Sequence, residues 1–152
     1  MREINFQDFF NEVVSILSNV KEIIVATSFN DRVTARTVYC ILDGINLYFI
    51  TSKAYTKYKQ IKRNSNIALA TSNIQMEGEV EILGHPSCEE YSYFKEICER
   101  DKDYMDYFKH YSKYKNTILI KVNPKLITVY KGKGTYKYLN LDEKKAYKKG
   151  RI

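Results

Sequence analysis

The feature that most constrains the fold is a pair of strand-like segments joined by a tight-turn signal. Val33–Leu42 and Ile45–Thr51 are rich in β-branched and aromatic residues, and Asp43-Gly44 stands between them. Glycine accepts the left-handed backbone that a two-residue hairpin turn requires. The pattern therefore predicts an antiparallel hairpin, and pairing across a turn at residues 43 and 44 sets Arg36 opposite Thr51.

The rest of the chain predicts more strands, with helices between some of them. A first helix follows Asn5 or Asp8, either of which is a suitable N-cap. Further strands are expected at Lys21–Phe29, Ile67–Asn73, Glu77–Gly84, Thr117–Val122 and Leu126–Tyr130, and further helices at Lys53–Arg63, after Ser87 and at Asp103–Tyr111. Hairpin-type connections dominate and βαβ alternation is absent. This order favours a mainly β fold, an antiparallel sheet or small β-barrel with peripheral helices.

Charge is spread unevenly along the 152 residues. The net charge is +7, and residues 131–152 hold eight Lys or Arg against Asp142 and Glu143, which leaves +1 for the first 130 residues. We therefore expect one domain over residues 1–130 and a solvated basic tail over 131–152. Tyr136, Tyr138 and Tyr147 alternate with the lysines, so a nucleic-acid-associated tail is an alternative function, although no nucleic-acid-binding signature accompanies it.

The sequence contains no motif typical of a membrane span, a signal peptide, a metal site or a disulfide framework. The apolar runs are too short to cross a bilayer, and the N-terminus does not have the plan of a signal peptide, so we expect a cytoplasmic protein without membrane contact. Cys40, Cys88 and Cys98 form no CxxC pair, and His85 and His110 stand alone. The sequence accordingly predicts no metal site and no disulfide framework.

One group of residues has the chemistry of a phosphate site. Arg36 offers a guanidinium fork, Thr51 and Ser52 offer hydroxyls at a strand-to-helix junction, and Lys57 lies about one helical turn further on. Phosphates bind where fixed cations and hydrogen-bond donors meet. The alternatives are an edge arginine, an ordinary helix cap and a charged helix face.

The same stretch resembles the FMN-binding split barrels of the pyridoxamine 5′-phosphate oxidase-like family. The resemblance rests on three elements in continuous register: Thr34-Ala35-Arg36-Thr37-Val38, then Tyr48-Phe49-Ile50-Thr51, then Lys57-Tyr58-Lys59-Gln60-Ile61-Lys62-Arg63-Asn64. It implies an antiparallel split β-barrel that binds FMN, and a homodimer whose subunits share the flavin sites.

The resemblance also implies roles for individual residues. Arg36 and Lys57 would neutralise the FMN phosphate with help from Thr51 and Ser52, and the backbone of Thr37, Val38 and Tyr39 would bond the pyrimidine edge of the flavin. Gln60 would brace the helix or approach the ribityl chain. Thr56, directly before the lysine, completes the expected cofactor-binding set, and Tyr39, Tyr48 and Tyr55 are candidates to line the site. The flavin would carry the chemistry, so no catalytic side chain is predicted.

Three departures separate this chain from the oxidase proper, and one of them is Glu79 before Val80, where the oxidase carries a glutamine. The oxidase has Ser-Arg before the lysine where this chain has Tyr55-Thr56, and its Arg-rich closing motif has no match in Thr135–Ile152. We therefore expect an FMN-dependent oxidoreductase that acts on another small molecule, with NAD(P)H as a candidate reductant. The alternative on the same fold is a flavin- or haem-binding or stress-related protein without turnover.

Overall fold

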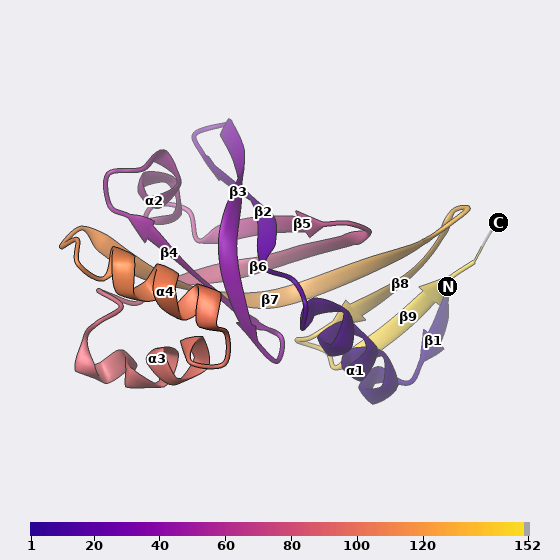
Figure 1. Ribbon diagram of the computed structural model, residues 1–152. Coiled ribbons are helices and arrows are strands. Elements are labelled where there is room, and N and C mark those ends of the chain that lie inside the picture. Colours follow the sequence, from indigo (N-terminus) through magenta and orange to yellow (C-terminus); the bar gives the residue numbers. More distant parts are fainter. Residues whose placement is uncertain (151–152) are drawn as a thin grey trace.

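The computed structural model describes residues 1–150, and its centre is a closed antiparallel barrel of six strands (Figure 1). The barrel order is β7-β4-β3-β2-β5-β6, closed by pairing of β6 with β7, and β8, β9 and β1 extend the sheet from β7. The elements are β1 Arg2–Ile4, α1 Phe6–Leu17, β2 Glu22–Phe29, β3 Arg32–Asp43, β4 Asn46–Ser52, α2 Thr56–Ile61, β5 Asn66–Thr71, β6 Ile74–Ile82, the 3-10 turn η1 Glu89–Tyr91, α3 Ser92–Cys98, α4 Lys102–Tyr111, β7 Thr117–Gly132, β8 Thr135–Asn140 and β9 Lys145–Lys149. The predicted mainly β fold with peripheral helices is confirmed.

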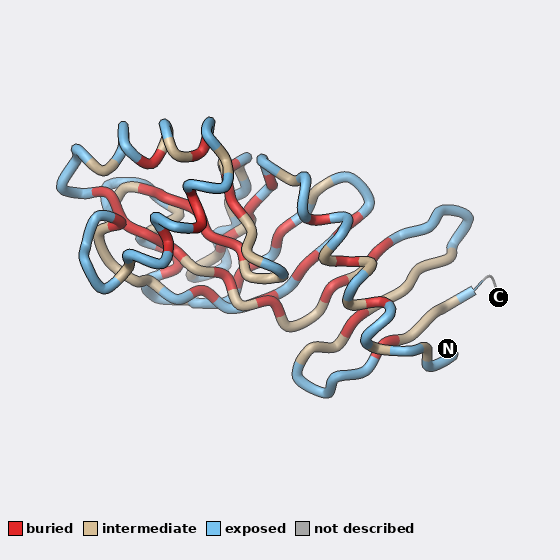
Figure 2. Tube along the Cα trace, turned by 60° about the horizontal axis from the view of Figure 1, so that its bottom comes forward, coloured by how far each residue is buried: buried red, intermediate tan, exposed pale blue. Residues whose placement is uncertain are grey.

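The main core fills the barrel and continues under α1. Buried and exposed residues alternate along β6, as expected for a strand with one face inside a barrel. The Asn5 side chain caps α1 by accepting a hydrogen bond from the Asp8 backbone N–H at 2.9 Å. Phe9, Val13 and Leu17 of α1 join the barrel core. Figure 2 shows buried residues concentrated in the barrel and beneath the helices.

A second core lies outside the barrel, beneath α3 and α4. Ile41, Tyr48, Ile50 and Leu119 point outward from β3, β4 and β7, and residues of the two helices pack on them, Phe94 among them. Five consecutive residues of β4 are buried for this reason, since one face of the strand meets the barrel core and the other meets the helices. This packing places the end of α4 beside the middle of β3 and the end of β4.

The hairpin of β3 and β4 exists, but the predicted register is wrong. Asp43 pairs with Asn46 and Cys40 pairs with Phe49, so the two turn residues are Gly44 and Ile45. Gly44 supplies the positive φ of 63°. The turn lies one residue later than predicted, which shifts the pairing by two residues. Arg36 is therefore not opposite Thr51 and pairs instead with Val25 of β2.

Two further boundaries differ from prediction. The helix expected over Lys53–Arg63 begins only at Thr56, because Ser52 accepts a hydrogen bond from the Ala54 N–H and forms a turn before the helix. The predicted break at Asn123-Pro124 does not end a strand. β7 continues through it, and a bulge at Lys125 of β7, opposite Glu77 and Gly78 of β6, accommodates the proline.

The expectation of a solvated tail is wrong for residues 135–149. These residues form β8 and β9, and β9 pairs with β1 from the start of the chain. Leu139 and Ala146 are fully buried in the main core. Residues 151 and 152, which the predicted tail included, lie outside the described residues. Within residues 1–150, no helix is long and apolar enough to cross a membrane.

Candidate functional site

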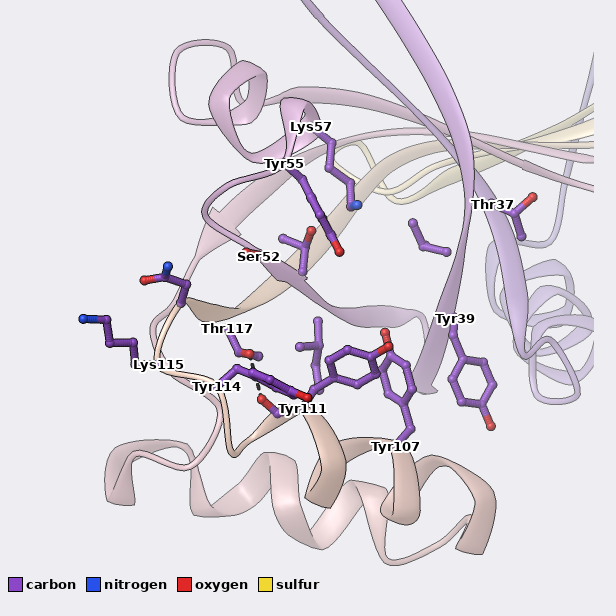
Figure 3. A pocket seen from close by; sticks show the side chains of 14 residues that line it. Thr37, Tyr39, Ser52, Tyr55, Lys57, Tyr107, Tyr111, Tyr114, Lys115 and Thr117 are labelled. Carbon is purple, nitrogen blue, oxygen red and sulfur yellow. Dashed lines mark hydrogen bonds between the residues drawn. The ribbon is translucent and has the colours of Figure 1, made fainter.

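A cavity of about 520 Å³ lies between the middle of β3, the end of β4, the start of α2 and the end of α4 (Figure 3). This volume is within the range of small-molecule and cofactor sites. The lining residues are Thr37, Val38, Tyr39, Ile50, Thr51, Ser52, Tyr55, Lys57, Tyr107, Tyr111, Tyr114, Lys115, Asn116 and Thr117. Two lysines and no carboxylates occur in this set, so the cavity favours an anionic ligand.

The cavity exists because β3 and β4 separate. Their ladder ends at Cys40 and Phe49, while β3 continues to pair with β2. The Cys40 N–H bonds the Lys21 carbonyl on the β2 side at 2.8 Å, and hydrogen-bonding direction alternates along an antiparallel strand. The backbone groups of Thr37 and Tyr39 therefore point toward β4 and the cavity, beyond the end of the ladder. They are placed to bond a ligand.

Lys57 supplies positive charge at one side of the cavity. Burial lowers the pKa of its ammonium group, and the nearby Arg36 guanidinium lowers that pKa further. Its Nζ lies 4.7 Å from the centre of the Tyr55 ring. Within residues 1–150 no carboxylate lies in ion-pair range of Lys57. An anion in the cavity would attract the ammonium group and raise this pKa, in opposition to both effects.

Arg36 and Gln60 lie behind the cavity wall and not on it. The Arg36 guanidinium donates to the Thr27 Oγ1 at 2.8 Å and to the Thr34 hydroxyl. Those two hydroxyls donate in turn to the Gln60 Oε1, at 2.5 and 2.6 Å. Gln60 Nε2 donates to the Arg32 carbonyl at 3.1 Å. The network joins α2 to β2 and β3, so Gln60 braces the helix that carries Lys57.

Thr51 carries an unusual hydroxyl. The residue lines the cavity and is 6% exposed, yet its Oγ1 has no hydrogen-bond partner within residues 1–150. A buried hydroxyl without a partner is costly, so a ligand that accepts its hydrogen bond would be stabilised there. Ser52 also lines the cavity, whereas Thr56 is exposed and does not.

The wall opposite Lys57 consists of tyrosines that the sequence did not single out. Tyr107 and Tyr111 come from α4, with ring centres 4.6 Å apart, and Tyr114 follows the helix. Burial raises the pKa of Tyr107 to about 12, so its ring is neutral and aromatic at physiological pH. Tyr39 and Tyr55 line the cavity as expected, but Tyr48 packs in the second core instead. The i, i+4 spacing of Tyr107 and Tyr111 was the signal available in the sequence.

Comparisons with known proteins find similarity in structure only. No family model and no curated protein matches the chain. A protein of the pyridoxinephosphate oxidase family from Clostridium acetobutylicum, related to general stress protein 26, has a TM-score of 0.67 at 17% identity, over 93% of this chain and 99% of that one. A FAD-binding protein from Mesorhizobium loti has a TM-score of 0.57 at 12% identity, over 77% of this chain and 90% of that one. A heme-binding protein from Mycobacterium smegmatis has a TM-score of 0.69 at 14% identity, over 86% of this chain and 57% of that one. The chain therefore has the pyridoxamine 5′-phosphate oxidase-like split-barrel fold.

Proposed function

We propose that this protein binds FMN in the cavity between β3, β4, α2 and α4, and is an oxidoreductase acting on a small molecule. The observation that carries the proposal is the pair formed by Lys57 and Thr51. Among residues 1–150, Lys57 is a cation without a carboxylate partner, and Thr51 carries a buried hydroxyl without a hydrogen-bond partner. Both line a cavity that contains no acid. A phosphate group satisfies both residues at once.

Other residues of the cavity fit the remaining parts of FMN. The backbone groups of Thr37 and Tyr39 match the hydrogen-bonding edge of a pyrimidine ring, and the rings of Tyr107 and Tyr111 offer an aromatic surface that excludes water. Arg36 adds positive potential behind Lys57. When bound, the flavin supplies the electron transfer, and these residues hold, orient and shield it.

Haem is the competing ligand on this fold, because one of the similar structures is a heme-binding protein. The lining residues include no histidine, cysteine or methionine, which are common axial ligands of haem iron. Tyrosine can also serve as an axial ligand, and several are present. The acid-free wall around Lys57 and Thr51 suits a phosphate and the propionates of haem alike, so the preference for a phosphorylated flavin rests on the lack of histidine, cysteine and methionine in the lining.

Cofactor release tests the proposal. Purified protein should be yellow, and denaturation should release a compound with the mass and absorbance of FMN. Bleaching by NAD(P)H, followed by reoxidation with an electron acceptor in repeated cycles, would support an oxidoreductase. Release of haem, or a colourless protein that FMN does not titrate, would refute the assignment. Reversible FMN binding without turnover would favour a carrier or sensor.

We also propose that the protein is a homodimer, paired through the outer face of β2, β3 and β5. This face exposes small and apolar side chains, with Ile24 47% and Val33 69% exposed and Ala35, Ala68 and Ala70 beside them. It continues to Thr37, which lines the cavity. A second copy seated there would bury this surface and enclose the open side of the site.

A further inference from the structure

The extension made by β8 and β9 has two very different faces. On one face, Leu139 and Ala146 are buried beneath α1, and Lys137 contacts Phe9 and Glu12 of that helix. Side chains alternate across a sheet, so Tyr136, Tyr138 and Tyr147 point to the opposite face. Helices α2, α3 and α4 gather at the other end of the molecule and do not cover it (Figure 1).

The rings on this uncovered face form two pairs on neighbouring strands. The Tyr138 and Tyr147 rings stack with centres 5.0 Å apart and planes 24° apart. The Tyr136 ring lies 5.9 Å from that of Tyr130 on β7, which is 47% exposed. Four aromatic rings on three neighbouring strands provide flat surfaces on which nucleic-acid bases can stack.

Positive charge surrounds these rings. Lys149 pairs with Tyr136, and its Nζ lies 5.9 Å from the ring centre. Lys145 pairs with Asn140 on the same face. Of the seven lysines in residues 131–150, Lys131 and Lys137 form ion pairs with Glu12 of α1, and Lys148 shares the face of Lys137. One of the two acids in this segment, Asp142, is in an ion pair with Lys125. Glu3 of β1 lies opposite Tyr147 in the strand register, at the outer edge of the same face.

We propose that this face, the β8–β9 tyrosine face, binds single-stranded nucleic acid. A second copy of this chain would bring an equal positive charge to the same surface and is disfavoured by repulsion. A polyanion is favoured, and the rings favour one that carries unpaired bases, since stacking needs a free aromatic face. The site is separate from the cavity and does not depend on FMN.

The test is fluorescence anisotropy of a labelled oligothymidylate of about 15 nucleotides, with salt varied from about 50 to about 200 mM. The double variant Tyr136→Leu/Tyr138→Leu should weaken binding at least about fivefold, because stacking is lost while the charge is kept. Lys145→Gln/Lys149→Gln should reduce the slope of log affinity against log salt by about 1.4, since each phosphate contact on a single strand contributes about 0.7.

Matched variants at the other end of the molecule serve as controls. Tyr93→Leu on α3 removes a tyrosine that is 40% exposed, and Lys102→Gln/Lys109→Gln on α4 removes two exposed lysines. Neither should change the affinity or the salt slope, and urea unfolding should confirm that every variant folds. The proposal is overturned if the oligonucleotide does not bind, if the controls weaken binding equally, or if heparin and anionic vesicles compete while the tyrosine variant binds like wild type.

Discussion

At the scale of single residues, Lys57 and Arg36 carry adjacent charges but have different roles. Lys57 faces the cavity, whereas Arg36 is tied by hydrogen bonds to Thr27 and Thr34 and does not line it. The sequence motif names both cations, and the two groups lie close together in the structure, since Arg36 lowers the pKa of Lys57. The motif could not show which cation faces the cavity and which one lies behind it. That difference depends on the hydroxyls of β2 and β3 that bond the Arg36 guanidinium.

We expect Lys57→Ala to weaken FMN binding by at least about 1.5 kcal/mol, the size of a charged hydrogen bond, with little change in stability. Lys59→Ala is the matched control, because Lys59 lies on the same helix but is exposed and outside the cavity. Titration calorimetry measures both. Equal losses in the two variants would mean that the general charge of α2, and not a phosphate contact, governs affinity.

Arg36→Ala should act first on stability. Without the guanidinium, the hydroxyls of Thr27 and Thr34 lose a donor in a mostly buried network, at a cost of about 1–3 kcal/mol. Urea unfolding at neutral pH measures this cost. An unchanged midpoint together with a large loss of FMN affinity would instead place Arg36 in direct contact with the ligand.

Burial raises the pKa of the Cys40 and Cys98 thiols from an ordinary 9.0 to about 12. The folded protein therefore retains protons that the unfolded chain loses, so stability is complete below pH 9 and falls as pH rises from 9 toward 12. Urea unfolding at pH 8 and at pH 10.5 should show this loss.

At pH 8 a thiol reagent should modify the exposed Cys88 and leave the buried Cys40 and Cys98 intact. Rapid reaction of all three in the folded state would contradict the buried placement.

At the scale of elements, the existence of the strands was predictable and their pairing was less so. Alternation and turn residues identified the hairpin, but the choice between a turn at residues 43–44 and one at 44–45 moves the register by two. The length of β7 was not predicted, because a proline usually ends a central strand, and here a bulge at Lys125 of β7 itself accommodates the proline. The strands β8 and β9 were not predicted, because their many lysines resemble a solvated segment. Only Leu139 and Ala146 of these strands are buried.

The bulge makes a testable contrast between two glycines. At Gly78 an added Cβ would lie 2.5 Å from the Asn123 carbonyl oxygen, so β6 and β7 would have to move apart. At Gly44 the added Cβ meets nothing within 4 Å, and the cost is that of the positive φ alone, about 1 kcal/mol. Gly78→Ala should therefore lower the free energy of unfolding more than Gly44→Ala. The reverse order would mean that the bulge adjusts freely.

At the scale of the whole molecule, the order of strands and helices predicted an antiparallel sheet or small barrel, and the family resemblance implied a split barrel. The closed barrel of six strands confirms the barrel. The tyrosine wall of the cavity could not be predicted in this way. It depends on α3 and α4 packing against the outside of β3, β4 and β7, a contact between segments far apart in the sequence. The same packing separates the site from the β8–β9 tyrosine face at the opposite end.

The proposed dimer is tested by a charge placed on the outer face. Ile24→Asp should convert the dimer to a monomer, because a carboxylate in an apolar interface is left without solvent or a partner. Ile16→Asp on α1 is the control, since Ile16 is an exposed isoleucine (37%) away from that face. Light scattering coupled to size exclusion measures the mass. A wild-type monomer, or a dimer that survives Ile24→Asp, would exclude this interface.

The central claim is that the cavity recognises a phosphorylated flavin through Lys57 and Thr51. Parallel titrations of FMN and riboflavin test it most directly, since the two ligands differ only in the phosphate. The account predicts that FMN binds at least about tenfold more tightly, and that Lys57→Ala removes most of this difference while leaving riboflavin affinity nearly unchanged. Equal affinity for the two ligands, or a preference for FMN that Lys57→Ala leaves intact, would contradict it.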